Sequence, residues 1–251
     1  MSAYYDSYDY PSYWKGREYE HEAEIMAIKS FINKIPKINT IVEVGAGYGR
    51  LVPSYYFRAK KIILSDPSAR LLKIAKSRLR NKGINFIQSS VENLHPKIRR
   101  NTADLVIFVR VIHHIQNIDS ALNIISKITK KGGYLILEFA NKRHLKATLF
   151  EFLKGNFTFP LDIFPKEIKS KNKKTKTIPF LNYHPDMIRE KLSQHGYNIV
   201  EQRSVSNIRS KFMKKIFSLD NLLILEKLLQ KPFSYIHFGP SIFVLAKKCS
   251  I

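Results

Sequence analysis

The chain has 251 residues, of which 44% are hydrophobic and 25% charged, the composition of an ordinary globular protein that can bury a full core. Cys249 is the only cysteine, so no intramolecular disulfide can form, and a reducing cytoplasmic setting is expected. Neither a membrane-spanning helix nor a signal peptide is predicted. The histidines are scattered without a His-x-x-x-His or Cys-x-x-Cys pair, so no metal site is predicted either.

The formal net charge of +23 is the unusual bulk property. A charge of this size favours polyanions such as RNA, DNA or the anionic surface of a membrane. It also follows from a composition rich in Lys, Ile and Asn, with lysines spread over solvated faces. The lysines are indeed spread along the chain, and the only dense cluster spans residues 166–176. We therefore favour the compositional explanation.

Strand and helix patterns alternate over the first 141 residues. The first 20 residues are rich in tyrosine, and apolar residues at a spacing of three to four then predict a helix over 20–35. Strands are predicted at 41–44, 62–66, 84–87, 104–109 and 134–141, with helices over 51–58, 68–80 and 121–128 between them. Gly132 and Gly133 are expected to end the last of these helices. Such alternation predicts a doubly wound α/β sheet.

Three glycines follow the first predicted strand at every second position, in the segment Glu43-Val44-Gly45-Ala46-Gly47-Tyr48-Gly49-Arg50. Glycine accepts positive φ and has no Cβ, so this turn lets the backbone approach a ligand closely. The dinucleotide fingerprint would need glycine at position 50, which is arginine. The prediction of a ligand-binding turn is strengthened by Glu43 just before the turn and by Asp66 at the end of the second predicted strand.

The segment from Glu43 to Gly49, together with Asp66, resembles the first motifs of the class I S-adenosylmethionine-dependent methyltransferases, specifically the methyltransferase type 11 group. The resemblance covers roughly residues 40–140. It implies a Rossmann-like seven-stranded sheet, mostly parallel with an antiparallel last strand at its edge, helices on both faces, and a lid inserted after the fifth strand. It also implies S-adenosylmethionine as cofactor. This cofactor carries a sulfonium and an ammonium but no phosphate, so carboxylates near the turn suit it.

Cofactor-binding residues are also implied by the resemblance. Asp66 would accept hydrogen bonds from both ribose hydroxyls. The loop at 90–92 would hold the adenine; many relatives carry Asp where this chain has Ser90, whose hydroxyl can still accept from the exocyclic amine. Arg17, in a segment expected to fold over the pocket, would pair with the methionine carboxylate, unless this segment is an aromatic arm packed on the surface. The full expected set is Arg17, Glu43, Gly45, Ala46, Gly47, Asp66, Pro67, Ser90, Val91, Glu92, Val109 and Arg110.

Two adjacent histidines follow the fourth predicted strand, at the end of the sheet where open α/β folds bind ligands. Methyl transfer requires positioning, exclusion of water and at most one base, and histidine titrates near neutral pH. We expect His113 or His114 to be that base, with His114 nearer the cofactor and His113 nearer the acceptor by the resemblance. Glu138 is a weaker candidate. The alternative is that one or both histidines are helix residues satisfied by local hydrogen bonds.

Residues beyond 141 carry less family information. A helix is predicted over 145–154, followed to residue 176 by a stretch without clear periodicity, which we interpret as a lid. Because relatives build the acceptor pocket here, the resemblance makes acceptor candidates of Phe157, Phe159, Phe164, Phe180, Tyr183 and His184. Packing within the lid would also explain the aromatic residues. A helix over 184–195, a strand at 197–205, one or two apolar helices within 212–229 and a last strand at 241–246 follow.

Four regions are therefore expected: an arm and helix covering the cofactor site (1–36), the cofactor-binding core (37–141), the lid (142–183) and a C-terminal completion of the sheet (184–251). We predict methyl transfer to a small-molecule acceptor, such as a metabolite, sugar or lipid-linked intermediate, because the acceptor-side segments are aromatic and apolar. The alternatives are an RNA-modifying methyltransferase and a binding module without catalysis. Lysines alternate with apolar residues in the predicted helices near the C-terminus. These helices would pack in the core of a monomer, form the interface of a homodimer, or rest on an anionic membrane.

Overall fold

The structure is a computed structural model that describes residues 9–80, 83–168 and 180–249. Seven of its strands form one sheet in the order β3-β2-β1-β4-β5-β9-β8. The parallel strands from β3 to β5 are β1 (Thr40–Val44), β2 (Lys61–Asp66), β3 (Ile84–Gln88), β4 (Ala103–Phe108) and β5 (Thr129–Ala140). The last strand, β9 (Ser241–Lys248), is antiparallel to both β5 and β8 (Tyr197–Val205). The predicted Rossmann-like sheet, mostly parallel with an antiparallel last strand, is confirmed.

The expectation that the last strand lies at the edge of the sheet is wrong. β9 lies between β5 and β8, and β8 is the edge strand. The burial of the two strands explains the order: residues 241–246 of β9 are all buried, whereas β8 exposes Asn198 and Val200. An unbroken apolar run suits a strand covered on both faces, and a strand with exposed polar positions suits an edge.

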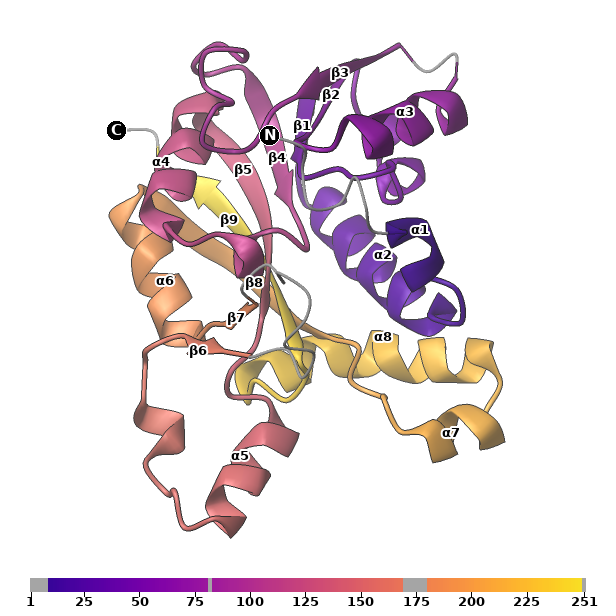
Figure 1. Ribbon diagram of the computed structural model, residues 1–251, viewed down its shortest axis with the longest axis vertical. Helices are drawn as coiled ribbons and strands as arrows, with labels where there is room; N and C mark the ends of the chain where they lie inside the picture. The colour runs from indigo at the N-terminus through magenta and orange to yellow at the C-terminus, as the bar shows by residue number, and fades with distance from the viewer. Residues whose placement is uncertain (1–8, 81–82, 169–179, 250–251) are drawn as a thin grey trace.

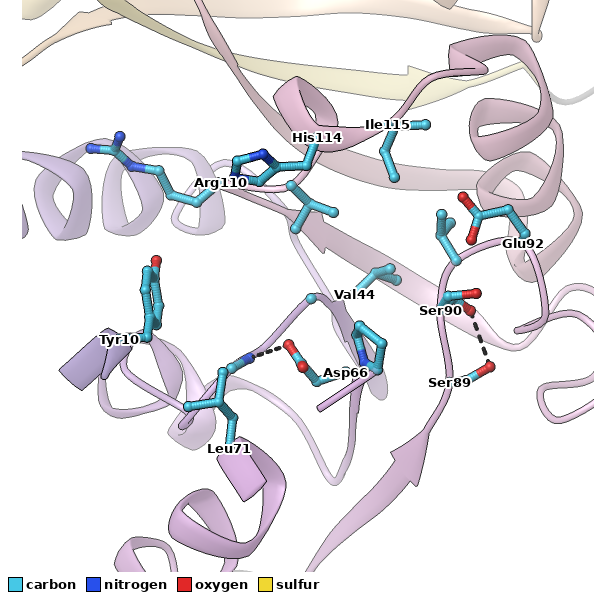
Figure 2. Close-up of a pocket in the computed structure, with 15 residues that line it drawn as sticks. Tyr10, Val44, Asp66, Leu71, Ser89, Ser90, Glu92, Arg110, His114 and Ile115 are labelled. Carbon is cyan, nitrogen blue, oxygen red and sulfur yellow. Dashed lines mark hydrogen bonds between the residues drawn. The ribbon is translucent and has the colours of Figure 1, made fainter. Parts of the chain in front are cut away.

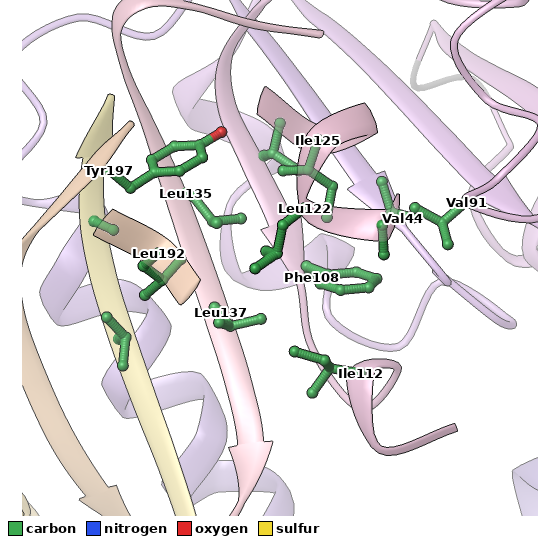
Figure 3. Close-up of a cluster of buried hydrophobic side chains, with 14 of the residues drawn as sticks. Val44, Val91, Phe108, Ile112, Leu122, Ile125, Leu135, Leu137, Leu192 and Tyr197 are labelled. Atoms are coloured by element: carbon green, nitrogen blue, oxygen red, sulfur yellow. The ribbon is translucent and has the colours of Figure 1, made fainter. Parts of the chain in front are cut away.

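Helices cover both faces of the sheet (Figure 1). One face packs against α4 (Ile118–Ile128) and α6 (Pro185–Gln194). The other lies against α2 (Glu18–Ile32), α3 (Ala69–Arg78) and α8 (Leu219–Tyr235). Because side chains alternate along a strand, Phe108 packs in the first core, part of which Figure 3 shows, and Ile107 packs in the second. Each such fully buried apolar side chain stabilises the fold by about 1.5–3 kcal/mol.

Two predicted helix boundaries differ from the structure. Instead of a helix over 51–58 the chain forms two 3-10 turns, Val52–Ser54 and Tyr56–Arg58. Between them Tyr55 turns its fully buried side chain inward, where its hydroxyl donates to the Glu43 carboxylate. The helix expected to end at Gly132 and Gly133 ends at Ile128, and both glycines lie inside β5 at an irregularity in its pairing with β4. The positive φ of Gly132 serves this irregularity rather than a helix end.

The remaining elements are short or stand apart from the sheet. A short α1 (Tyr10–Tyr13) precedes α2, and a 3-10 turn (Ile112–His114) follows β4. After β5 come α5 (Leu145–Leu153), a 3-10 turn (Phe159–Leu161), the small hairpin of β6 (Lys166–Glu167) and β7 (Leu181–Asn182), and later α7 (Lys211–Ile216). Figure 1 shows α5 standing away from the sheet, and no residue of this helix is buried. In the described ranges, no helix combines the length and apolarity needed to cross a membrane.

Some sequence-based expectations concern residues outside these ranges. Tyr4, Tyr5 and Tyr8 of the aromatic N-terminus lie outside the described residues, as do positions 169–176 of the lysine cluster. The expected lid over 142–183 is described only for 142–168 and 180–183.

Candidate active site

A cavity of about 260 Å³ opens where β1, β2 and β4 end, and we name it the first pocket (Figure 2). Its lining residues are Tyr10, Val44, Gly45, Gly47, Asp66, Pro67, Leu71, Ser89, Ser90, Val91, Glu92, Arg110, Val111, His114 and Ile115. This set unites the glycine turn, the end of the second strand, the loop at 90–92 and one of the two histidines. Sequence motifs far apart in the chain therefore meet at one edge of the sheet, as open α/β folds require.

The glycine turn is held by bonds within the chain. The N–H groups of Gly45 and Ala46 both donate to the Ser65 carbonyl, at 2.7 and 2.9 Å, and the N–H of Gly47 donates to Asp66 Oδ2 at 2.8 Å. The chain then enters 3-10 turns rather than an α-helix. These three N–H groups are engaged and no helix N-terminus follows, so the turn lacks the usual features of a phosphate site.

Asp66 carries a carboxylate whose orientation is set from both sides. Its Oδ2 accepts from Gly47 and its Oδ1 accepts from the N–H of Ser68 at 2.8 Å, while the Ser68 hydroxyl caps α3. Figure 2 shows the carboxylate at the pocket edge of the glycine turn. A carboxylate has about four acceptor positions, so one that is oriented by backbone N–H groups can also accept from hydroxyl groups of a ligand.

Three residues of the expected cofactor-binding set lie in the protein interior instead. Glu43 is buried on the other side of β1, bonded to Tyr55, and does not line the first pocket. Burial raises its pKa to about 7, although the Tyr55 hydroxyl acts in the opposite direction. Ala46 and Val109 belong to the core under α2. Alternation along β1 accounts for Glu43, because its neighbour Val44 takes the position that faces the pocket.

A buried ion cluster that the sequence analysis missed supports the Arg110 side of the pocket. Glu24 of α2 is fully buried and accepts from Arg110 Nε at 2.8 Å and from Arg50 Nη2 at 2.5 Å. Both guanidinium groups lie over the Trp14 ring, at 3.6 Å for Arg50 and 5.5 Å for Arg110. Burial opposes ionisation, yet the charges of Arg110 and Arg50 lower the pKa of Glu24. The sequence held one indication of this cluster, because Glu24 is an acidic residue on the apolar face of the predicted helix.

Arg110 itself has an unusual backbone that Glu138 secures. Its φ is +64°, and its N–H donates to Glu138 Oε2 at 2.9 Å. The other oxygen of Glu138 accepts from the Ser241 hydroxyl at 2.6 Å. Burial raises the pKa of Glu138 even though the nearby charge of Arg110 acts against this. Glu138 thus joins the loop after β4 to the start of β9.

The two histidines have different surroundings. His114 lines the first pocket, whereas His113 is buried against Phe180, with 4.4 Å between ring centroids. Within residues 9–80, 83–168 and 180–249, His113 Nδ1 has no hydrogen-bond partner. Burial, assisted by the nearby charges of His114 and Arg110, lowers the pKa of His113 well below its usual value.

A second cavity, of about 270 Å³, shares Arg110 with the first, and we name it the second pocket. Its lining residues are Tyr13, Arg17, Glu20, Arg110, Glu138, Ala140, Asn141, His144, Ile168, Phe180, Asn182, Ser206, Arg209, Pro240 and Ser241. Arg17 lies here rather than in the first pocket, with its guanidinium 4.2 Å from the Tyr13 ring centroid. Two buried polar atoms at this cavity, Glu20 Oε2 and Ser206 Oγ, have no hydrogen-bond partner among the residues that the structure describes.

The aromatic acceptor candidates separate into different environments. Phe180 lines the second pocket, while Phe157 and Phe164 are more than 70% exposed. The Tyr183 hydroxyl donates to the carbonyls of Ile112 and Ile115, and the His184 side chain caps α6, so both support the fold. Phe159 is buried.

Among the side chains that the structure describes, no group of three or more His, Cys, Asp or Glu could hold a metal ion.

Comparison with known proteins associates this geometry with one reaction class. A family model described as a methyltransferase domain matches residues 42–137. The chain is 25% identical to tRNA 5-carboxymethoxyuridine methyltransferase of Escherichia coli strain K12 over 220 residues, which is 85% of this chain and 81% of the relative. It is 33% identical to an uncharacterized protein of Methanocaldococcus jannaschii over 176 residues, 66% of this chain and 72% of the relative.

Other relatives match over shorter spans or in fold alone. Identity to the mitochondrial ubiquinone biosynthesis O-methyltransferase of Dictyostelium discoideum is 28% over 116 residues, which is 42% of this chain and 36% of the relative. The chain thus spans about a third of that relative's length. The structure of an S-adenosylmethionine-dependent methyltransferase from Thermotoga maritima superposes with a TM-score of 0.62 at 16% identity, covering 97% of each chain. The structural likeness shows a shared fold.

Proposed function

Since this chain belongs to the class I S-adenosylmethionine-dependent methyltransferases, we propose that it methylates a small-molecule acceptor held in the second pocket. The observation that carries the proposal is the pair of buried, unpartnered polar atoms, Glu20 Oε2 and Ser206 Oγ, at a cavity that adjoins the first pocket through Arg110. A buried polar group without a partner is destabilising by about 1–3 kcal/mol, so a ligand that bonds to it gains affinity.

S-adenosylmethionine is the cofactor, and the residues of the first pocket fit it. The chemistry of the lining supports this fit: a carboxylate, a hydroxyl and apolar walls surround a turn whose N–H groups of Gly45, Ala46 and Gly47 are already engaged. We assign Asp66 to the ribose hydroxyls and Ser90 and Glu92 to the adenine, whereas Arg17, which lines the second pocket, is left out of the cofactor set. When bound, the cofactor supplies an electrophilic methyl group on a sulfonium.

The residues of this chain would act mainly by positioning the cofactor and the acceptor and by excluding water, and less by acid–base catalysis. The lowered pKa of His113 makes it a weak base, and the Glu138 oxygens are occupied by Arg110 and Ser241. His114, which lines the first pocket, is therefore the base that we favour for an acceptor proton. Glu138 instead serves as a positioning residue, because its bond to the Arg110 N–H holds the left-handed backbone between the two pockets.

Calorimetry with S-adenosylhomocysteine tests the cofactor half of this proposal. Asp66→Asn should weaken binding about tenfold or more, because it removes the charge from hydrogen bonds to the ribose. The control is Asp220→Asn at an exposed position in α8, which should bind like the wild type. Equal affinity of the Asp66 variant and the wild type would remove Asp66 from the cofactor site.

Isotope-labelled S-adenosylmethionine tests the acceptor half. The protein is incubated separately with dialysable metabolites, with a lipid extract and with total tRNA, and the label is counted in each. Label in the metabolite or lipid fraction, lost when His114 is replaced by Gln, is the expected result. Label confined to tRNA would overturn the small-molecule proposal.

Transfer to RNA is the second candidate, and two observations favour it. The formal charge is +23, and the E. coli relative that aligns over most of this chain is a tRNA methyltransferase. Salt separates the candidates, because phosphate contacts release counterions. Methylation of tRNA should fall steeply between roughly 50 and 200 mM salt, whereas turnover of a small acceptor should change little.

A further inference from the structure

A groove of about 910 Å³ runs along α5, and the function proposed above leaves it unexplained. Its apolar wall is one face of α5, with Leu149 and Leu153 exposed by 52% and 87%. The opposite wall comes from Asn207, Arg209, Ser210 and residues 238–240. In the described ranges, no residue of α5 is buried, so this apolar face does not serve the core. We refer to this cavity as the α5 groove.

The α5 groove is continuous with the second pocket. His144, Arg209 and Pro240 line both cavities, so the apolar channel opens into the polar one at these three residues. A molecule that enters the second pocket with its polar end can therefore leave its remaining length along α5. A groove that served only to dock a partner would not need this connection to the site of transfer.

The junction is positively charged. Arg209 forms no ion pair within the part of the chain that the structure describes, and Lys146 lines the groove nearby. In the described residues neither carboxylate of the second pocket pairs with Arg209, since Glu20 bonds to Lys214 at 2.7 Å through Oε1 and Glu138 accepts from Arg110 and Ser241. An exposed guanidinium without a carboxylate partner, between an apolar channel and a polar pocket, suits an oxyanion.

We propose that the methyl acceptor is an amphiphile whose oxyanion binds at Arg209 and whose apolar tail lies in the α5 groove. This inference rests on the proposed function, because it assigns the acceptor of the same second pocket. Burial of the tail against Leu149 and its neighbours would supply affinity, and the guanidinium would set which end enters the pocket.

Binding of decanoate to the protein saturated with S-adenosylhomocysteine tests the proposal. Decanoate should bind at least about tenfold more tightly than butanoate, because its longer chain buries additional methylene groups. It should also bind about tenfold more tightly than decan-1-ol, since the alcohol offers Arg209 no charge. Arg209→Gln should abolish the preference for decanoate over the alcohol. Leu149→Asp should weaken both ligands.

Matched controls separate the groove from general surface effects. Arg99→Gln and Leu161→Asp alter exposed residues outside both cavities and should leave decanoate binding unchanged. Equal binding of butanoate and decanoate, or an unaffected Leu149 variant, would overturn the inference. So would binding to phosphatidylglycerol vesicles that depends on Leu149 without binding of free decanoate, because α5 would then rest on a membrane. Loss of S-adenosylhomocysteine binding would instead contradict the proposed function, so the two failures are distinguishable.

Discussion

The cofactor side and the acceptor side of this molecule satisfy their polar and apolar groups in different ways. Around the first pocket, the turn N–H groups bond within the chain, and Glu24, Arg50 and Arg110 pair in the interior. Around the second pocket and the α5 groove, Glu20 Oε2 and Ser206 Oγ lack partners in the described part of the chain, and the apolar face of α5 is exposed. The first side is therefore organised mainly by bonds within the chain, whereas the second leaves an apolar helix face exposed beside its cavity.

This difference follows from what each side must recognise. A pre-organised pocket loses little conformational entropy on binding, which suits a cofactor that is the same in every cycle. An acceptor site can leave groups unpaired because its ligand satisfies them, at a local loss of stability. Substitutions on the first side should therefore lower the stability of the fold, and those on the second should chiefly change binding.

The largest effect is expected at Glu24. Glu24→Gln keeps the shape but removes the charge between two guanidinium groups, so it should destabilise the protein by about 3–5 kcal/mol. Urea unfolding would measure this change. The matched variant Glu151→Gln removes the partly exposed ion pair with Lys166 on the acceptor side and should leave the unfolding midpoint nearly unchanged. Equal midpoints for the two variants would remove the contrast between the sides.

Next in size is the glycine turn. A Cβ on Gly45 would lie 2.2 Å from Val111 Cγ2, and the φ of this residue is +73°. Gly45→Ala should therefore destabilise the fold by roughly 3 kcal/mol, through a clash added to backbone strain. Gly155→Ala has a similar φ of +82° but no atom within 4 Å of the new Cβ, so only about 1 kcal/mol of strain remains. Thermal unfolding of both variants separates the clash from the strain.

Glu43 should make stability depend on pH. Its folded pKa is about 7 because of burial, above that of an unfolded glutamate, so the folded state binds the extra proton. The stability of the wild type should therefore fall as pH rises from about 4.5 to 7. Glu43→Gln removes this term and should gain up to about 3 kcal/mol relative to the wild type across that window. A difference between the two proteins that stays constant with pH would mean that Tyr55 keeps the carboxylate ionised.

The first pocket was largely predictable because its residues follow strand ends in a local pattern. Gly45, Gly47, Asp66 and the loop at 90–92 all line it, as the alternation of strands and helices requires. Contacts between distant segments had no such local signal. Glu24 reaches Arg110 across 86 positions of the chain, and nothing in the local spacing selects that partner. The 3-10 turns after the glycines were missed because the bond from Tyr55 to Glu43 overrides helix propensity.

The position of β9 was missed for a similar reason. Its apolar run predicts a strand, and the resemblance implied an antiparallel edge, but the order of strands depends on which faces the other elements cover. The α5 groove was likewise predicted only as a general lid. An apolar helix pattern does not distinguish a face buried in the core from one kept open for a ligand.

The smallest effect tests that last distinction directly. Leu153 is 87% exposed in α5, so Leu153→Ser should change the free energy of unfolding by no more than about 0.5 kcal/mol. Leu192→Ala, at a completely buried position of α6, should destabilise by about 2–5 kcal/mol through lost contacts and a cavity. Urea unfolding of both variants compares a leucine of the groove with a leucine of the core. A loss at Leu153 comparable to that at Leu192 would mean that α5 is packed in solution and that its apolar face belongs to the fold rather than to a ligand.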